Sequence, residues 1–461
     1  MSPSASSSPA KPSIRRFTGL DWINSILYSL DYGADNPDIK RLFGYQDKSG
    51  GEPSRLHVSW GALQDSQGQP VEGLWLGEKS RQLEADELLK AARATADTPV
   101  FRDRVRITHR GAAAEAGKFD RSVLAAGYRF SVELSLWSET ANDPGWANIL
   151  NLLAHPLFRL GGGGRAGLGK IKAVLAHSRC FDLKNLDADR QAFATLSPSL
   201  AAVQDMPEIK LAHPSCNRLV SATLRLQPMD FWRIGQGDNP HLKDGSGKPA
   251  DLLPKTERRV RWKGGKGRLA EAELLVPAAS LKGALAHRVA FHANRLAGIW
   301  AEEQANLADY DKSKQCEAVR NLFGYARDDR DKTENAPKGQ AGRIYLDDAY
   351  VAYDPAEQSQ DLRLLMHNAI DRFTGGVREH FLFSEELVWN KPIALALVID
   401  THQVDAAARE ALGLALDDLC QSRLGLGGGA GKGHGLFTGS LEWSDQGRWI
   451  SGTNIDAEEA A

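Results

Sequence analysis

Two glycine-rich segments carry basic side chains and are candidates for binding an anion. The first, residues 164–170, reads GRAGLGK and fits the GxxxxGK pattern of nucleotide-binding loops. However, Ile171 follows where a magnesium-binding Ser or Thr is needed, and the predicted helix precedes the loop instead of following it. We therefore reject nucleotide hydrolysis. Because exposed backbone N–H groups approach phosphate closely, the alternative to a purely structural turn is contact with a nucleic-acid backbone through Arg165, Lys170, Lys432 and His434.

Asp238 lies in the segment GQGDNPHLKD, residues 235–244, and its carboxylate could bind a divalent metal or accept a proton. Asp244 and Asp230 are close enough in sequence to supply further carboxylates. From the residues alone, a solvated aspartate in a turn is the simpler interpretation, since Asp is common before Asn-Pro.

Basic residues crowd the next part of the chain. Seven Lys and Arg residues lie between Lys255 and Arg268, with Trp262 among them, and we predict that Arg259 and Arg261 contact RNA phosphates. The alternative is a solvated charged surface. Further on, Ser280 is placed to begin a helix, so that its hydroxyl and Lys282 could meet phosphate at a helix N-terminus.

Four blocks of sequence recur in the same order, which predicts an internal duplication. LFGY occurs at 42–45 and 322–325, and each copy precedes a strand-like run. The stretch from Val105 resembles the one from Ala369, and RLGGGG at 159–164 resembles RLGLGG at 423–428. We predict a tail at 1–13, a first domain at 14–205, a second at 206–448 and a tail at 449–461.

The expected elements of the second copy follow one another as strand, helix, strands, a long hairpin, strand, helix, glycine loop and strand. The alternation from Ser221 predicts a half-buried strand, and residues 282–303 repeat apolar residues at helical spacing. Residues 393–400 read as a buried strand and the stretch from Asp405 as an amphipathic helix. This order is that of a ferredoxin-like, RRM-like α+β fold.

The helix–GGGxxxGxG–strand ending resembles the RAMP superfamily of CRISPR proteins. In the second copy the aspartate loop, PAASLKG at 277–283, LFGY and IDRFTGG at 370–376 resemble, in that order, the backbone subunits of type III CRISPR effectors. The resemblance implies two tandem RAMP domains with thumb hairpins and C-terminal glycine loops, assembled on CRISPR guide RNA with complementary target RNA and other effector subunits. It implies that Arg372 and Phe373, in the second thumb, wedge between bases.

The resemblance also implies that Asp238 cleaves target RNA by transesterification with Mg²⁺ or another divalent metal. The first copy has no aspartate loop before its LFGY, and only residues 15–30 can replace the helix. We therefore predict one cleavage site at most, in the second copy. The open alternatives are a subunit that only holds guide RNA, a nuclease that processes CRISPR precursor with His287 or His292 as base, and a protein scaffold.

Composition sets weaker limits. The 461 residues include 57 Lys+Arg and 59 Asp+Glu, so any RNA surface must be local. Four scattered cysteines disfavour a zinc site and a disulfide framework, which predicts a cytoplasmic protein. No apolar stretch reaches the length of a membrane span, and no membrane partner is predicted.

Overall fold

The computed structural model describes residues 37–46, 50–108, 111–201, 206–212, 218–303, 315–326, 339–356 and 360–452. The predicted N-terminal tail, the predicted helix at 15–30 and Cys216 lie outside these residues. The predicted C-terminal tail begins within a short helix, α11 (Arg448–Ser451).

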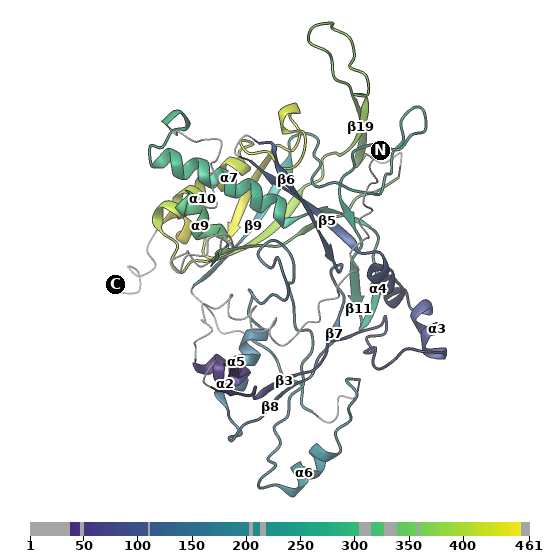
Figure 1. Ribbon diagram of the computed structural model, residues 1–461, viewed down its shortest axis with the longest axis vertical. Helices are drawn as coiled ribbons and strands as arrows, with labels where there is room; N and C mark the ends of the chain where they lie inside the picture. Colours follow the sequence, from purple (N-terminus) through teal and green to yellow (C-terminus); the bar gives the residue numbers. More distant parts are fainter. Residues whose placement is uncertain are drawn as a thin grey trace, which may run out of the picture.

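One antiparallel sheet of four strands organises the second half of the chain. Side by side, the strands are β16 (Ile344–Leu346), β20 (Ile393–Asp400), β9 (Leu219–Pro228) and β21 (Phe437–Trp443). Along the chain, helix α7 (Ala278–Leu296) separates β9 from β16, and α10 (Ala406–Cys420) separates β20 from β21. This β-α-β-β-α-β order is the ferredoxin-like one, and the mixed α+β class predicted from sequence is confirmed (Figure 1).

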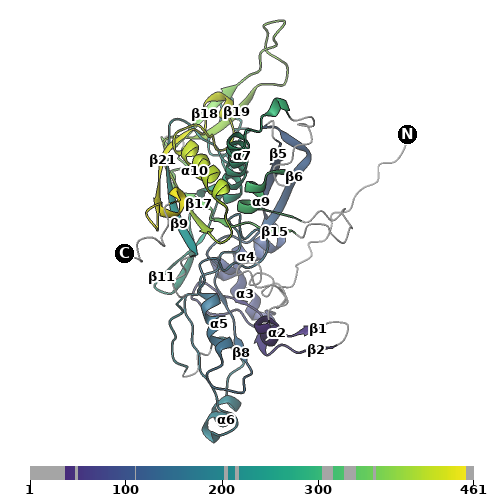
Figure 2. The ribbon, with the colours of Figure 1, turned by 90° about the vertical axis from the view of Figure 1, so that its left-hand side faces the viewer.

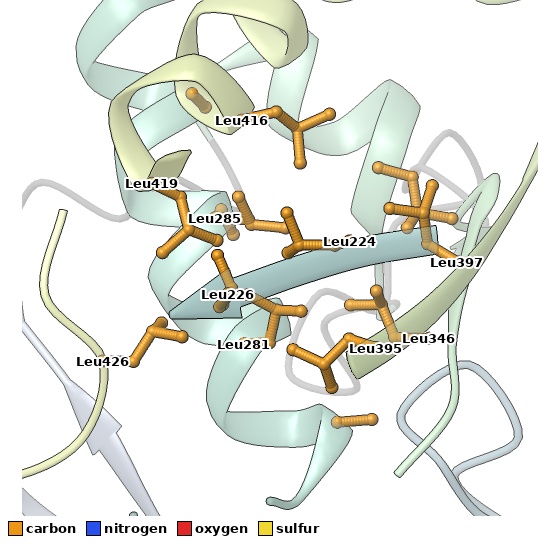
Figure 3. Packing of buried hydrophobic residues seen from close by; sticks show 14 of the residues in the cluster. Leu224, Leu226, Leu281, Leu285, Leu346, Leu395, Leu397, Leu416, Leu419 and Leu426 are labelled. Carbon is orange, nitrogen blue, oxygen red and sulfur yellow. The ribbon is translucent and has the colours of Figure 1, made fainter. Parts of the chain in front are cut away.

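The core of this half lies between the sheet and its helices. Strand β9 alternates buried and exposed residues, so Leu224 and Leu226 face the core while Arg225 faces solvent. Leu281 and Leu285 of α7, one helical turn apart, pack onto the same layer. Figure 3 shows these leucines meeting side chains from β20, α10 and the second glycine loop.

Smaller elements surround the sheet. Beside it lie a three-stranded sheet, β10 (Thr256–Glu257), β13 (Glu273–Val276) and β17 (Ala349–Val351), and two hairpins, β11 (Val260–Lys263) with β12 (Lys266–Leu269) and β18 (Leu362–His367) with β19 (Phe383–Val388). The remaining elements are the 3₁₀ turns η1 (Ala301–Glu303) and η3 (Ala430–Lys432), helix α9 (Glu317–Phe323), and the strand pair β14 (Gly324–Tyr325) and β15 (Gln340–Ala341).

The described part of the first half contains only two-stranded sheets. They pair β1 (Tyr45–Gln46) with β2 (Gly51–Glu52), β3 (Leu56–Val58) with β8 (Leu134–Leu136), β4 (Ala62–Leu63) with β7 (Phe130–Ser131), and β5 (Val100–Ile107) with β6 (Ala113–Val123). The helices are α2 (Pro37–Phe43), α3 (Glu78–Ala85), α4 (Glu87–Asp97), α5 (Pro144–Leu153) and α6 (Asp187–Ala194). A second four-stranded sheet is not formed by these residues, so the tandem ferredoxin-like fold stays a prediction.

The LFGY motif nevertheless has one conformation in both halves. Gly44 and Gly324 both have positive φ, 71° and 76°, directly after helices α2 and α9. Arg55 donates its backbone N–H to Leu42 at 3.0 Å, and Arg343 donates its N–H to Leu322 at 2.8 Å. The duplication predicted from this motif therefore extends to local hydrogen bonding.

The two halves differ where a central strand is needed. In the second half β9 pairs with both β20 and β21. In the first half the corresponding position lies between β8 and residues 171–177, and none of the described residues forms a strand there. Residues 171–177 form only an isolated bridge, from His177 to Glu208. Trp137, Val174 and Leu175 are consequently exposed, beside an open cleft of about 3390 Å³.

Hairpin β5–β6 of the first half lies against the second half (Figures 1 and 2). Arg102, on β5, is buried between Glu257 and Asp348, with N–O distances of 2.5 Å to each. Although burial opposes it, the two carboxylates raise the pKa of the Arg102 guanidinium above its usual value. Near the hairpin tip, the backbone oxygen of Ile107 lies 3.1 Å from the His287 ring nitrogen of α7.

Candidate nucleic-acid interface

The two glycine loops share one backbone conformation. Gly161, Gly163, Gly167 and Gly169 have φ of 78°, 81°, 90° and 72°, and the second loop repeats the series with 86°, 80°, 87° and 71° at Gly427, Gly429, Gly433 and Gly435. The closing hydrogen bonds also agree, since Leu160 N–H donates to Gly169 at 2.8 Å and Leu426 N–H donates to Gly435 at 2.9 Å. The loops are therefore structural copies.

Glycine is required where each loop closes. A Cβ on Gly169 would lie 2.0 Å from the Leu160 carbonyl oxygen, and one on Gly435 would lie 2.1 Å from that of Leu426. Both residues also have positive φ, which disfavours side chains. Any other residue at these positions would force the loop open.

This conformation corrects the sequence alignment of the two loops. Pairing Arg159 with Arg423 sets the loops two residues out of register, because the shared φ series matches Gly161 to Gly427. In the corrected register Lys432 corresponds to Ala166 and His434 to Leu168. The basic residues of the two loops thus occupy different positions, so their charges are not a repeated feature.

Four basic side chains from both halves surround the first loop, and we call them the cationic cluster. They come from the loop, from hairpin β5–β6 and from the first turns of α7: Arg165, Arg104, Arg121 and Lys282. Arg121 approaches the loop at Gly162 and Gly163, where an added Cβ would lie 3.1 and 2.7 Å from its Nη1.

The charges of the cationic cluster act on one another. Burial, and then the positive charges of Arg165 and Arg104, lower the pKa of Lys282 to about 8. Burial and Arg121 likewise lower the pKa of Arg104. Within the described residues none of Arg104, Arg121 and Lys282 forms an ion pair, and Arg121 Nη1 is buried without a hydrogen-bond partner. An anion bound here would relieve both the repulsion and the missing hydrogen bond.

Helix α7 begins at Ala278 with Pro277 at its N-cap, so the prediction that Ser280 begins the helix is wrong. Ser280 lies within the first turn, and Lys282 follows in the next. Their helix end is already occupied in part, because Ala278 N–H donates to Asp348 at 2.8 Å. Ser280 is half-buried and lies two residues before Lys282 in the helix. The sequence prediction of an anion site at this turn is consistent with the adjoining cationic cluster.

The other predicted residues of the first loop have intramolecular partners. Lys170 contacts Asp347 at 2.5 Å, and the Arg165 Nε donates to the Gly342 carbonyl at 2.7 Å while its guanidinium lies 4.9 Å from the Tyr345 ring. Arg165 is thus held in place as a member of the cationic cluster, whereas Lys170 pairs with an acidic side chain.

The second loop presents less positive charge. His434 is buried, and its ring lies 5.9 Å from Phe231. Lys432 is half-exposed, 3.8 Å from the Glu385 carboxylate and 5.1 Å from the Phe383 ring. RNA contact by these two residues stays a prediction.

The basic hairpin β11–β12 lies against the first half. Arg259 and Arg261 both pair with Glu273, at 2.7 and 2.8 Å, and Arg259 also stacks on Tyr350 at 3.9 Å. Trp262 Nε1 donates to the Gly127 carbonyl at 2.8 Å. The hairpin is therefore used to join the halves, and its predicted RNA contacts remain untested.

Asp238 is open to solvent, with 84% of its side chain exposed and the Lys255 ammonium 3.9 Å away. Asp244 lies in the same loop, where hydrogen bonds from Ser246 and the Lys248 backbone lower its pKa. Asp230 precedes the loop and is exposed. Within the described residues no group of three His, Cys, Asp or Glu side chains is arranged to hold a metal ion, so these residues alone do not form a metal site.

The hairpin above β18 and β19 projects from the second half (Figure 1). Phe373 at its tip is 95% exposed, and neighbouring Arg372 is exposed as well. Phe381 is exposed with Arg378 stacked over it at 4.3 Å, and Phe383 contacts the His367 ring. The predicted stacking side chains are thus available to a ligand at the tip and packed at the base.

The histidines considered for precursor processing lie elsewhere. His292 is buried, and Asp418 holds its Nε2 at 2.7 Å. Although burial favours the neutral acid, hydrogen bonds from Arg423, His292 and Arg288 lower the pKa of Asp418 to about 2. His287 contacts the first hairpin. Both histidines therefore have structural contacts.

Part of the chain is similar to a known protein family. Residues 232–438 match the family model of the RAMP superfamily. This part of the chain is therefore similar to the RAMP superfamily. It begins after β9 and ends within β21, so it covers the aspartate loop, α7, the projecting hairpin and the second glycine loop. No curated protein matches the chain.

The RAMP match does not reach the first half, although the cationic cluster depends on it. Sequence reasoning missed Arg104 and Arg121, because they read as ordinary charged residues of a hairpin. The available signal was the alternation VFRDRVRI at 100–107, which places Arg102, Arg104 and Arg106 on one face of a strand. Of the described helices, none has the length and apolar character needed to cross a membrane.

Proposed function

We propose that this chain is a CRISPR RNA-binding backbone subunit of a type III antiviral ribonucleoprotein, and that its cationic cluster binds a phosphate of the guide RNA. The observation that carries this is the convergence of Arg104, Arg121, Arg165 and Lys282 on one loop, with Arg121 Nη1 buried and unpaired. Holding these positive charges close together destabilises the free protein, and a bound RNA phosphate would reduce their mutual repulsion.

Guide-RNA binding over a range of salt concentrations tests this proposal. The double variant Lys282→Ala, Arg121→Ala should bind at least about tenfold more weakly and reduce the salt slope by about one. Lys79→Ala with Arg81→Ala, on exposed positions of α3, is the matched control and should leave both unchanged. Equal binding by the two double variants would refute the phosphate site.

We further propose that the second half cleaves target RNA through Asp238. In this reaction a 2′-hydroxyl loses its proton to the carboxylate and attacks the adjacent phosphorus. The bond from phosphorus to the 5′-oxygen breaks, leaving a cyclic phosphate, and the 5′-oxygen takes a proton from water to leave as a hydroxyl. The supporting observation is an exposed carboxylate on a loop anchored at both ends. The described residues do not form a metal site by themselves, so we assign no step of the reaction to a metal ion.

Target cleavage by the assembled ribonucleoprotein distinguishes a nuclease from a subunit that only holds RNA. Asp238→Asn should abolish cutting at the position this subunit faces while guide binding is kept, and Asp97→Asn, at the exposed end of α4, should cut normally. Undiminished cutting by Asp238→Asn would leave the RNA-holding function alone.

A further inference from the structure

Three consecutive polar residues are buried on strand β19, at the base of the projecting hairpin. Ser384 and Glu385 are 1% exposed and Glu386 is fully buried. Burying carboxylates is costly unless each is hydrogen-bonded. The partners of these three residues therefore indicate what the strand is needed for.

Glu386 binds the C-terminal side of the aspartate loop. Its Oε2 accepts the backbone N–H groups of His241 and Leu242, both at 3.0 Å, and its Oε1 lies 2.9 Å from His241 Nδ1. The other ring nitrogen of His241 lies 2.9 Å from the Tyr353 hydroxyl. One buried carboxylate thus fixes the chain three residues after Asp238.

Ser384 and Glu385 bind the two flanks of the same loop. Ser384 N–H donates to the Asp251 carboxylate at 2.9 Å, and its carbonyl accepts from Leu252 N–H at 3.0 Å. Glu385 accepts from Arg233 Nε at 2.7 Å. Arg233 precedes the loop, and its carbonyl accepts Gly428 N–H of the second glycine loop at 2.9 Å.

The backbone on both sides of Asp238 is held by hydrogen bonds, while its carboxylate is exposed to solvent near Lys255. Gly237 N–H donates to the Leu253 carbonyl at 2.9 Å, and a Cβ on Gly237 would lie 2.1 Å from the Pro254 oxygen. In contrast, most of the Asp238 side chain is exposed. Strand β19 pairs with β18 over six residues, so the loop and the hairpin form one hydrogen-bonded unit.

We propose that Glu386 is a positioning residue that fixes the Asp238 loop to the projecting hairpin, so that target RNA is cut at a constant position relative to this hairpin. This inference rests on the proposed function of the second half. Glu386 does not touch the reacting atoms; it acts through the backbone of His241 and Leu242. A shift of about 1 Å in such a loop is enough to reduce a rate about 100-fold.

Two measurements on Glu386→Gln test the inference. In the free protein, hydrogen exchange at the amides of His241 and Leu242 should accelerate about tenfold or more, while the peptides of β18 and β19 stay protected. In the ribonucleoprotein, target binding should be kept, cutting should slow about tenfold or more, and the cuts should spread over neighbouring nucleotides. Glu410→Gln, exposed on α10, is the control and should match the wild type.

A second variant covers the case in which Glu386→Gln unfolds the strand. Tyr353→Phe removes only the hydroxyl beside His241, and should broaden the cut position with little loss of rate. Unchanged amide exchange in both variants, or cutting at the wild-type position and rate, overturns the inference. If Asp238→Asn cuts normally the proposed nuclease fails instead, and amide exchange alone then decides whether Glu386 fixes the loop.

Discussion

The two hairpins of this chain have related sequences but opposite surroundings. Hairpin β5–β6 is packed on the second half through Arg102 and the Ile107 contact, whereas the hairpin above β18 and β19 extends into solvent with Phe373 exposed. Beside them, the two glycine loops have the same backbone but differently placed charges. The two halves therefore share backbone geometry at these loops, while their side chains and surroundings differ.

The difference indicates how residues from two related halves of one chain can meet at a single site. The first hairpin brings Arg104 and Arg121 to the first glycine loop, and α7 of the second half adds Lys282. The second hairpin has no such surface to pack on among the described residues. The first hairpin is thus packed between the halves, whereas the projecting hairpin is exposed.

Breaking the packed hairpin should have the largest effect. Arg102→Ala leaves Glu257 and Asp348 buried without their cation, and we expect the free energy of unfolding to fall by about 4 kcal/mol. Urea denaturation measures this change. Arg106→Ala, four residues along the same strand and exposed, should change it by less than about 0.5 kcal/mol. Similar values for both variants would contradict the packed role of β5–β6.

The equivalence of the glycine loops predicts equal costs at equivalent positions. Gly169→Ala and Gly435→Ala each place a Cβ against a carbonyl oxygen at positive φ, and each should destabilise the fold by about 3 kcal/mol. Gly431→Ala is the control, because nothing lies within 4 Å of its added Cβ. Thermal unfolding tests the three variants. A neutral Gly169→Ala would show that the first loop does not share the second loop's constraint.

The cationic cluster at the first loop predicts that guide-RNA affinity depends on pH through the protonation of Lys282. Its pKa of about 8 in the free protein should rise when phosphate binds, so binding takes up a proton above pH 8. Guide affinity should be fully present below pH 8 and fall up to about tenfold per pH unit above it. Lys282→Arg stays charged and should show a flat profile. A sloping profile for this variant would assign the proton to another group.

The same pKa fixes the sign of the stability effect. Between pH 8 and the ordinary lysine value of 10.5 the unfolded chain binds a proton that the folded chain lacks. This contribution to stability therefore increases with pH over that window, and it is unfavourable at pH 7. Lys282→Met should consequently be more stable at pH 7 while binding guide RNA less well, which calorimetry and binding measurements would check together.

The smallest effect on stability is expected at the free hairpin. Phe373→Ala removes a ring that is 95% exposed, so the free energy of unfolding should stay within about 0.5 kcal/mol of the wild type. Target binding should weaken by about 1–3 kcal/mol if the ring stacks on a base. A large loss of stability would mean that the hairpin packs on the protein after all.

Sequence reasoning captured the local and periodic features of the second half. Alternation at β9, helical spacing in α7 and the glycines of the second loop each depend on neighbouring residues, so the α+β class and the order of elements followed from them. The same reasoning aligned the two glycine loops two residues out of register, because Leu160 of the first Arg-Leu pair closes its loop, whereas Leu426, two residues after the second pair, closes the other. The φ series at Gly161 and Gly427 decided the register.

The sequence by itself determined the duplication of LFGY, the RAMP-like motifs of the second copy and the candidate Asp238. Only the tertiary structure decided that Arg259 and Arg261 pair with Glu273, and that Arg104 and Arg121 join Lys282 at the first loop. It alone also revealed Glu386 beneath the aspartate loop. The physical reason is that charge interactions depend on distance in space and on burial, and these partners lie far apart along the chain.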